Sequence, residues 1–243
     1  MGKSQTPIRL ALIFIALSVF SGQAIAQSAK PKATPKPKAT PAKAAPAQPK
    51  AASSSLSALE TEIFNEINLL RANPAAYAKY LEPMRSGFNG TILTMADGEQ
   101  LMTNEGVAGI NDAIAYLKTA RSSPAFKLSP GLTAATADHL RDLIKNNLSG
   151  HKGSDGSWPP DRVDRYGKWS GEVKENISYH AVSARDIVIN MLIDDGNPKR
   201  DHRKNLVSAD LKSIGLSGGD SKTYGRVAVI VFAVGFAEKH SAK

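Results

Sequence analysis

The C-terminal part of the chain contains an unbroken apolar run, which restricts the fold more than any other feature of the sequence. Between Arg226 and Phe236 the residues are almost all apolar, and most are β-branched. A strand with one face in solvent alternates polar and apolar residues, so this run is typical of a central strand covered on both faces. Upstream, Ser213–Ser217 is strand-like and Gly218–Asp220 has the composition of a turn. Together they predict an antiparallel hairpin at the end of the domain.

The segments before this hairpin are mostly helical in pattern. Apolar residues recur at helical spacing in four segments, at residues 59–70, 107–117, 132–148 and 184–193. Ser57 and Glu60 form a capping-box signature at the start of the first segment, and Asn73-Pro74 ends it. A short helix over 75–81 and a small hairpin over 88–102 are also expected. Helices first and a hairpin last predict an α+β domain with helices packed on a sheet.

The N-terminus has the pattern of a secretory signal peptide over residues 1–26. Lys3 and Arg9 precede an apolar stretch from Leu10 to Phe20, and Ala24-Ile25-Ala26 has the small residues that a signal peptidase requires. The stretch has 11 residues, whereas a bilayer span needs about 20. We therefore expect a secreted or periplasmic protein, with a retained membrane anchor as the alternative.

Residues 27–55 are rich in Pro, Ala and Lys and are expected to form a disordered linker. They act either as a spacer or as a lysine-rich tail that contacts an anionic envelope surface. Of the 31 basic residues in the chain, eight precede Glu60, the first acidic residue, which leaves 23 basic against 22 acidic residues in the rest. The domain is therefore nearly neutral, and nucleic acid is not an expected partner.

The remaining residues, 56–238, are expected to form one domain. The chain contains no cysteine, so disulfides cannot stabilise it and lipid attachment through a cysteine is excluded. A domain of this size can be stabilised by its apolar core alone. We expect it to act as a monomer.

Four positions combine histidine and acidic side chains near loops or element ends: His151, Glu175, Asp194 (with Asp195 beside it) and His202. Imidazole and carboxylate are the normal ligands of zinc, so the four side chains are candidates for a divalent cation site. They are equally compatible with a hydrogen-bonded polar cluster that lines a cleft. The sequence contains neither a cysteine nucleophile nor a serine-hydrolase elbow.

The order of several short motifs resembles the bacterial branch of the CAP superfamily, whose domain is also called SCP and which includes the cysteine-rich secretory, antigen 5 and pathogenesis-related proteins. The motifs are Ser149-Gly150-His151, Glu175-Asn176-Ile177, Asp194-Asp195-Gly196 and His202-Arg203-Lys204-Asn205-Leu206. Asn65–Asn68 with Arg71–Pro74 is similar to the first helix of the family. The resemblance covers residues 59–236 and implies a three-layer α-β-α sandwich with a small, mainly antiparallel sheet.

The resemblance also implies a central cleft that carries two histidines and two acids, which bind a divalent cation in several members. By motif, these are His151, Glu175, His202 and an acid before the second histidine, with Asp194 the first candidate and Asp195 the second. Many members have glutamate at this last position. Arg203 is expected to be solvated or paired with one of the two aspartates.

His139 and His180 are not expected to take part in this site. His139 lies on the apolar face of the helical segment 132–148, which favours a packed histidine with a satisfied hydrogen bond over a ligand. His180 lies outside every motif and is expected at the surface.

These features favour a binding module whose histidine–acid cleft holds a divalent cation or a small or polymeric ligand of the envelope or the extracellular space. The first alternative is a metal-dependent hydrolase of envelope or extracellular substrates, in which Glu175 or Asp194 is the base for a metal-bound water. The second alternative is a structural envelope protein whose working part is the lysine-rich tail.

Overall fold

The computed structural model describes residues 56–95 and 98–239. The expected signal peptide over residues 1–26 and the expected linker over residues 27–55 lie outside the described residues. Within the part of the chain that the structure describes, no helix is long and apolar enough to cross a membrane.

A four-stranded sheet forms the middle layer, with the strand order β4-β6-β7-β5. The strands are β4 (Lys127–Leu128), β5 (Gly167–Ser178), β6 (Ser213–Ser221) and β7 (Gly225–Glu238). β7 pairs antiparallel with β5 on one side and with β6 on the other, while the short β4 runs parallel to β6. The prediction that the 226–236 run is a central strand is therefore confirmed.

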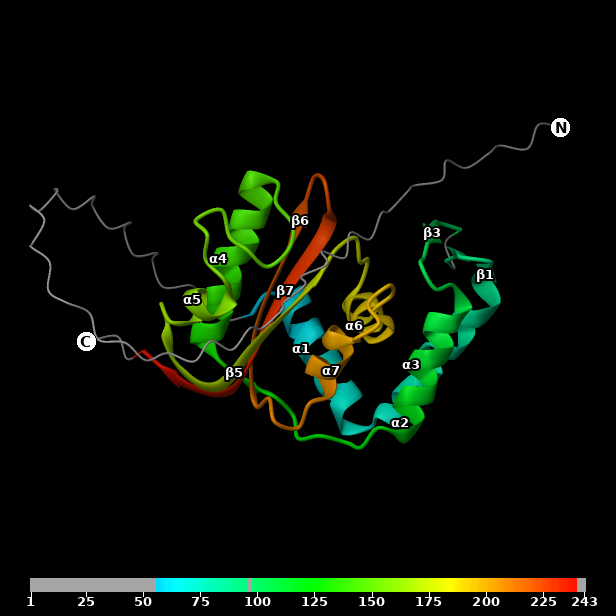
Figure 1. The fold of residues 1–243 in the computed structure, drawn as a ribbon, viewed down its shortest axis with the longest axis horizontal. Coiled ribbons are helices and arrows are strands. Elements are labelled where there is room, and N and C mark those ends of the chain that lie inside the picture. The colour runs from blue at the N-terminus through cyan, green and yellow to red at the C-terminus, as the bar shows by residue number, and fades with distance from the viewer. Residues whose placement is uncertain (1–55, 96–97, 240–243) are drawn as a thin grey trace, which may run out of the picture.

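Helices cover both faces of this sheet (Figure 1). The helices on one face are α4 (Pro130–Asn146) and α5 (Pro159–Val163). Those on the other face are α1 (Ala58–Ala72), α6 (Ala184–Ile193) and α7 (Asp201–Val207). The apolar side chains of β7 alternate between the two faces: Val229 packs with Leu140 and Leu143 of α4, whereas Ile230 belongs to the core around α1 and α6. The predicted α+β, three-layer α-β-α sandwich is confirmed.

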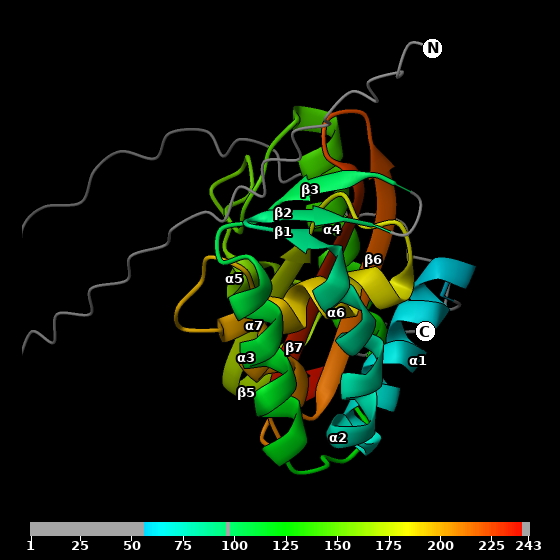
Figure 2. The same ribbon diagram turned by 90° about the vertical axis from the view of Figure 1, so that its right-hand side faces the viewer.

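A further group of elements lies beyond α6, away from the sheet (Figures 1 and 2). It contains α2 (Pro74–Tyr77), two 3-10 turns, η1 (Ala78–Tyr80) and η2 (Glu82–Gly87), and α3 (Val107–Thr119). It also contains a three-stranded antiparallel sheet of β1 (Phe88–Asn89), β2 (Ile92–Thr94) and β3 (Gln100–Met102). Figure 2 shows this small sheet at one end of α3. The predicted hairpin is present as β2 and β3, and β1 is an additional strand.

The turn predicted at residues 218–220 is wrong, because β6 continues to Ser221 and the hairpin closes at residues 222–224. Gly218 and Gly219 lie inside the strand, where helices approach from both faces. A Cβ atom on Gly218 would lie 3.0 Å from Leu59 Cδ2 of α1, and one on Gly219 would lie 3.4 Å from Leu140 Cδ2 of α4. These glycines therefore serve close packing rather than chain reversal.

Arg71 joins the end of α1 to the loop before β4 and to the C-terminal end of α7. It is 1% exposed, and its guanidinium donates hydrogen bonds to the carbonyl oxygens of Pro124 (2.8 Å), Leu206 (2.8 Å) and Ser208 (2.9 Å). It also stacks on the ring of Phe126, with Cζ 3.7 Å from the ring centroid. Burial lowers the pKa of Arg71 to about 10, so the group remains charged at neutral pH.

Replacing this arginine by an apolar residue of similar length would leave three carbonyl groups without a donor. We expect Arg71→Met to lower the free energy of unfolding by about 2 to 4 kcal/mol, measured by urea denaturation of the chain without its signal peptide. Arg121→Met, at an exposed position, is the matched control and should change little. Equal stabilities for the two variants would contradict this role of Arg71.

Candidate functional site

His151 and Glu175 form a hydrogen-bonded pair on the α4 side of the sheet. Glu175 lies inside β5, and its Oε1 is 2.9 Å from His151 Nδ1. The side chain of Glu175 is 1% exposed and that of His151 is 26% exposed. Because a carboxylate accepts the hydrogen bond, Nδ1 carries the proton, and in the neutral ring Nε2 has a free lone pair. The pair thus presents an imidazole to solvent above a buried carboxylate.

Three other side chains fix the position of His151. The Nε2 of His139 lies 2.9 Å from the carbonyl oxygen of Gly150, and the hydroxyl of Tyr179 accepts a hydrogen bond from the amide of Gly150 at 2.8 Å. Arg162 donates to the carbonyl oxygen of His151 at 3.1 Å and to Glu175 Oε2 at 2.8 Å. The backbone of Gly150 and His151 is therefore held by side chains from α4, from α5 and from the residue that follows β5.

His202 and Asp194 form a second pair of the same kind on the other side of the sheet. Asp194 ends α6, and its Oδ1 is 2.7 Å from His202 Nδ1 in the first turn of α7. Oδ2 accepts hydrogen bonds from the backbone amide of His202 and from the side chain of Asn197, both at 3.0 Å. The side chain of Asp194 is 1% exposed and that of His202 is 23% exposed, so this imidazole also reaches solvent above a buried acid.

Asp195, the other candidate for the second acid, points elsewhere. It accepts hydrogen bonds from the backbone amides of Asn104 (2.6 Å) and Glu105 (2.9 Å), in the loop before α3. The geometry therefore makes Asp194 the acid that pairs with His202. Asp194 has a left-handed backbone with φ of 51°, which aspartate and asparagine adopt more readily than glutamate. The left-handed backbone therefore favours aspartate over glutamate at this position.

Asn176 connects the two pairs along β5. It follows Glu175, so its side chain points to the opposite face of the sheet, where its Nδ2 donates to the carbonyl oxygen of His202 at 3.0 Å. Its Oδ1 accepts a hydrogen bond from Asn205 at 2.8 Å. β5 is an edge strand of the main sheet. From its opposite faces, Glu175 holds the imidazole of His151 and Asn176 holds the backbone of His202.

The chemistry available at the site is that of two oriented imidazoles. Both oxygens of Glu175 and both oxygens of Asp194 already accept hydrogen bonds, so the carboxylates orient the rings. Within residues 56–95 and 98–239, no three histidine or acidic side chains lie together so as to hold a metal ion. In each pair, the ring nitrogen left for a ligand is Nε2.

The structure corrects several details of the sequence interpretation. Glu175 lies within strand β5 and His202 within helix α7, whereas the sequence placed both near loops or element ends. The elements β5, α5 and α7 were not predicted. Arg203 is buried and bonds to Asp112 at 2.9 Å and to the carbonyl oxygens of α6, rather than to Asp194 or Asp195. Arg162, Asn176 and Tyr179 were also missed as supporting residues. Of these three residues, only Asn176 could have been found from the sequence, because it lies within the Glu175-Asn176-Ile177 motif.

His139 is packed as expected, but only one of its ring nitrogens has a partner. It is fully buried, and Nδ1 has no hydrogen-bond partner among the described residues. Burial lowers its pKa; nearby Arg162 also lowers it, while Glu175 and Asp142 raise it. Because the unfolded chain binds the proton more tightly, stability is lost as the pH falls below the unfolded pKa of about 6.5.

We therefore expect His139→Gln, which keeps a side-chain N–H donor, to lose less stability on acidification than the wild type. The difference in unfolding free energy between the variant and the wild type should change by at most about 1.4 kcal/mol per pH unit below pH ~6.5. Urea denaturation of both proteins from pH ~7.5 to pH ~5 measures it. Parallel curves for the two proteins would show that His139 does not titrate in this window.

Comparison with known proteins assigns this chain to a family. The family model of the cysteine-rich secretory proteins, CAP, matches residues 64–234, which include both pairs. No protein of curated function matches the sequence.

Two solved structures are similar to the chain. An outer surface protein from Borrelia burgdorferi is 17% identical with a TM-score of 0.39, and the match covers 48% of this chain and 80% of that protein. An extracellular SCP-domain protein from Bacillus anthracis is 18% identical with a TM-score of 0.38, and the match covers 52% of this chain and 37% of that protein. The match of the family model over most of the chain is decisive: the chain belongs to the cysteine-rich secretory protein (CAP) family.

Proposed function

We propose that this chain is a binding domain that works outside the cytoplasm, with the imidazoles of His151 and His202 as its ligand-binding groups. The observation that carries the proposal is the repeated arrangement of a partly exposed imidazole above a buried carboxylate. Each carboxylate uses both oxygens within the protein, which favours orientation of the rings over acid–base chemistry by Glu175 or Asp194. A binding role needs only the two Nε2 atoms.

The class of ligand that fits these atoms best is a divalent cation such as zinc. Histidines that bind metal through Nε2 commonly donate Nδ1–H to a carboxylate, as both histidines do here. A catalytic zinc site commonly has three protein ligands, whereas the described residues offer two imidazole nitrogens. A bound cation would supply a positive charge with coordination positions left for a small or polymeric ligand of the envelope.

The export signal and the lysine-rich tail support the proposed location. Residues 1–26 have the signal-peptide pattern, and residues 27–55 carry six lysines and no acidic residue. Positive charges near an anionic surface contribute about 1 kcal/mol each, and salt screens them. We propose that the tail attracts the domain to an anionic envelope.

The cation proposal predicts that zinc stabilises the protein. At a hundredfold excess of zinc over its dissociation constant, the free energy of unfolding should rise by about 2.7 kcal/mol. The double variant His151→Ala, His202→Ala should lose this increase. Binding should weaken as the pH falls, because both rings must be neutral to bind.

Calorimetry with and without zinc, at several pH values, measures both the stabilisation and its pH dependence. The matched control is His180→Ala, since His180 is exposed and lies outside the site; it should keep the zinc effect. An unchanged melting temperature of the wild type in zinc would exclude the cation, and an equal response of the double variant would place binding elsewhere.

The proposed role of the tail predicts salt-sensitive binding to anionic surfaces. The chain from residue 27 should bind vesicles that contain anionic lipid more tightly than the chain from residue 56 does, and the difference should disappear at high salt. Co-sedimentation at low and high ionic strength, with vesicles of neutral lipid as the control, measures this. Equal binding of the two chains would contradict the proposal.

A further inference from the structure

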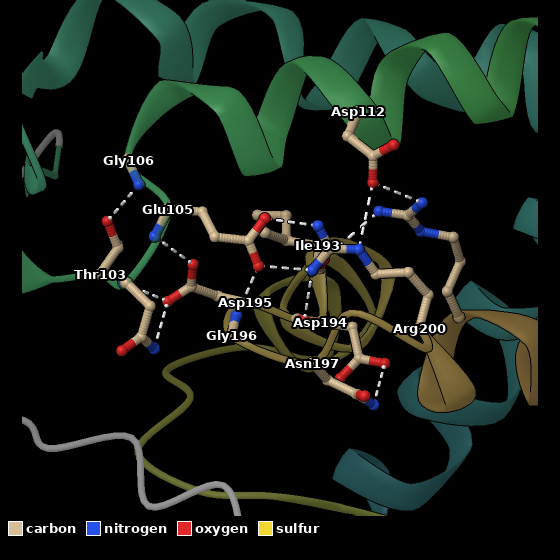
Figure 3. Close-up of polar contacts among 12 residues, drawn as sticks. Thr103, Glu105, Gly106, Asp112, Ile193, Asp194, Asp195, Gly196, Asn197 and Arg200 are labelled. Carbon is tan, nitrogen blue, oxygen red and sulfur yellow. Dashed lines mark hydrogen bonds and ion pairs between the residues drawn. The ribbon is translucent and has the colours of Figure 1, made fainter.

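The loop between α6 and α7 and the loop before α3 exchange hydrogen bonds in both directions (Figure 3). Asp195, in the first loop, accepts from the backbone amides of Asn104 and Glu105 in the second. Glu105 in return accepts from the backbone amide of Gly196 at 2.7 Å. Each loop thus supplies a carboxylate for amide groups of the other. Movement of one loop without the other would break these hydrogen bonds.

Arg200 joins this exchange to the backbone of the site. Its guanidinium is paired with Glu105 and donates to Asp112 Oδ2 at 3.1 Å and to the carbonyl oxygen of Asp194 at 2.8 Å. The bonds to Glu105 and Asp194 are visible in Figure 3. Arg200 lowers the pKa of Glu105, as expected for an ion pair that is mostly shielded from solvent. We refer to Glu105, Asp195 and Arg200 as the interloop network.

The backbone of the loop is strained at both ends. Asp194 and Arg200 have φ of 51° and 52°, a left-handed conformation that is unfavourable for a residue other than glycine. Such conformations persist where the surrounding structure over-determines them. Arg200 in this conformation directs its guanidinium back to the carbonyl oxygen of Asp194, and Asp194 directs its carboxylate to His202.

We propose that Glu105, Asp195 and Arg200 are positioning residues, which hold Asp194 and thereby set the orientation of the His202 ring. Because the loop before α3 supplies Glu105, the elements beyond α6 control one half of the site. The hydrogen bonds that hold His151 come from α4, α5 and β5 and include none of these residues. The use of zinc binding as a readout rests on the proposed function. The orientation of the His202 ring can be observed whether or not zinc binds.

The first test observes the rings directly. In the ¹⁵N-histidine spectrum of the chain from residue 27, Glu105→Gln should shift the ring signals of His202 and leave those of His151 in place. Arg200→Gly should do the same; because glycine fits the left-handed backbone, this variant remains informative if Glu105→Gln fails to fold.

The control for this test is Glu66→Gln, which breaks the ion pair of Glu66 with Arg185 (2.7 Å) between α1 and α6. It should leave both histidines in place. Unchanged His202 signals in the two network variants would overturn the proposal, as would equal shifts of both histidines or the same shift in the control.

The second test is a double-mutant cycle on zinc affinity. Glu105→Gln should weaken zinc binding about tenfold, the lower end of the effect of removing support around a metal site. It should cause no further loss in the His202→Ala background. An equal loss in both backgrounds would show that Glu105 acts on the fold rather than through His202. If zinc does not bind the wild type, the proposed cation role fails, and the spectra still decide the positioning role.

Discussion

The structure depends on the burial of one strand from two sides. β7 pairs with β5 and β6 along its edges, and its side chains enter the α4 core on one face and the α1–α6 core on the other. This double burial excludes water from the backbone hydrogen bonds of the sheet and makes the neighbouring strand β5 a rigid support. Every group of the candidate site is held directly or indirectly against β5.

The site follows from the position of β5 at the edge of the sheet. Successive residues of a strand point to opposite faces, so Glu175 reaches His151 on the α4 side and Asn176 reaches the backbone of His202 on the α7 side. The two buried carboxylates, Glu175 and Asp194, fix the rings through Nδ1, and each ring remains partly exposed to solvent. A two-residue segment of one strand thereby organises groups that come from two helical layers.

Much of the fold could be predicted from local sequence patterns, and the wrong or missing predictions have a common cause. The capping box at Ser57 and the apolar periodicity of α4 and α6 identified those helices, because their signals lie within one or two turns of the chain. β5 escaped detection because its residues Lys168–Lys174 are mostly polar and are exposed or only partly buried, as an edge strand permits. Gly218 and Gly219 were misread as a turn because nothing in the local sequence shows that two helices pack against them.

The sequence by itself determined the α+β class, which depends on periodicity. It also determined the family and three of the four side chains of the two pairs, His151, Glu175 and His202, which depend on the order of short motifs. Only the tertiary structure decided that Asp194 rather than Asp195 pairs with His202, and that Arg203 joins Asp112 instead of an acid of the site. Adjacent aspartates are equivalent in a sequence. Their roles separate only when the left-handed turn at Asp194 points one carboxylate to α7 and the next one to the loop before α3.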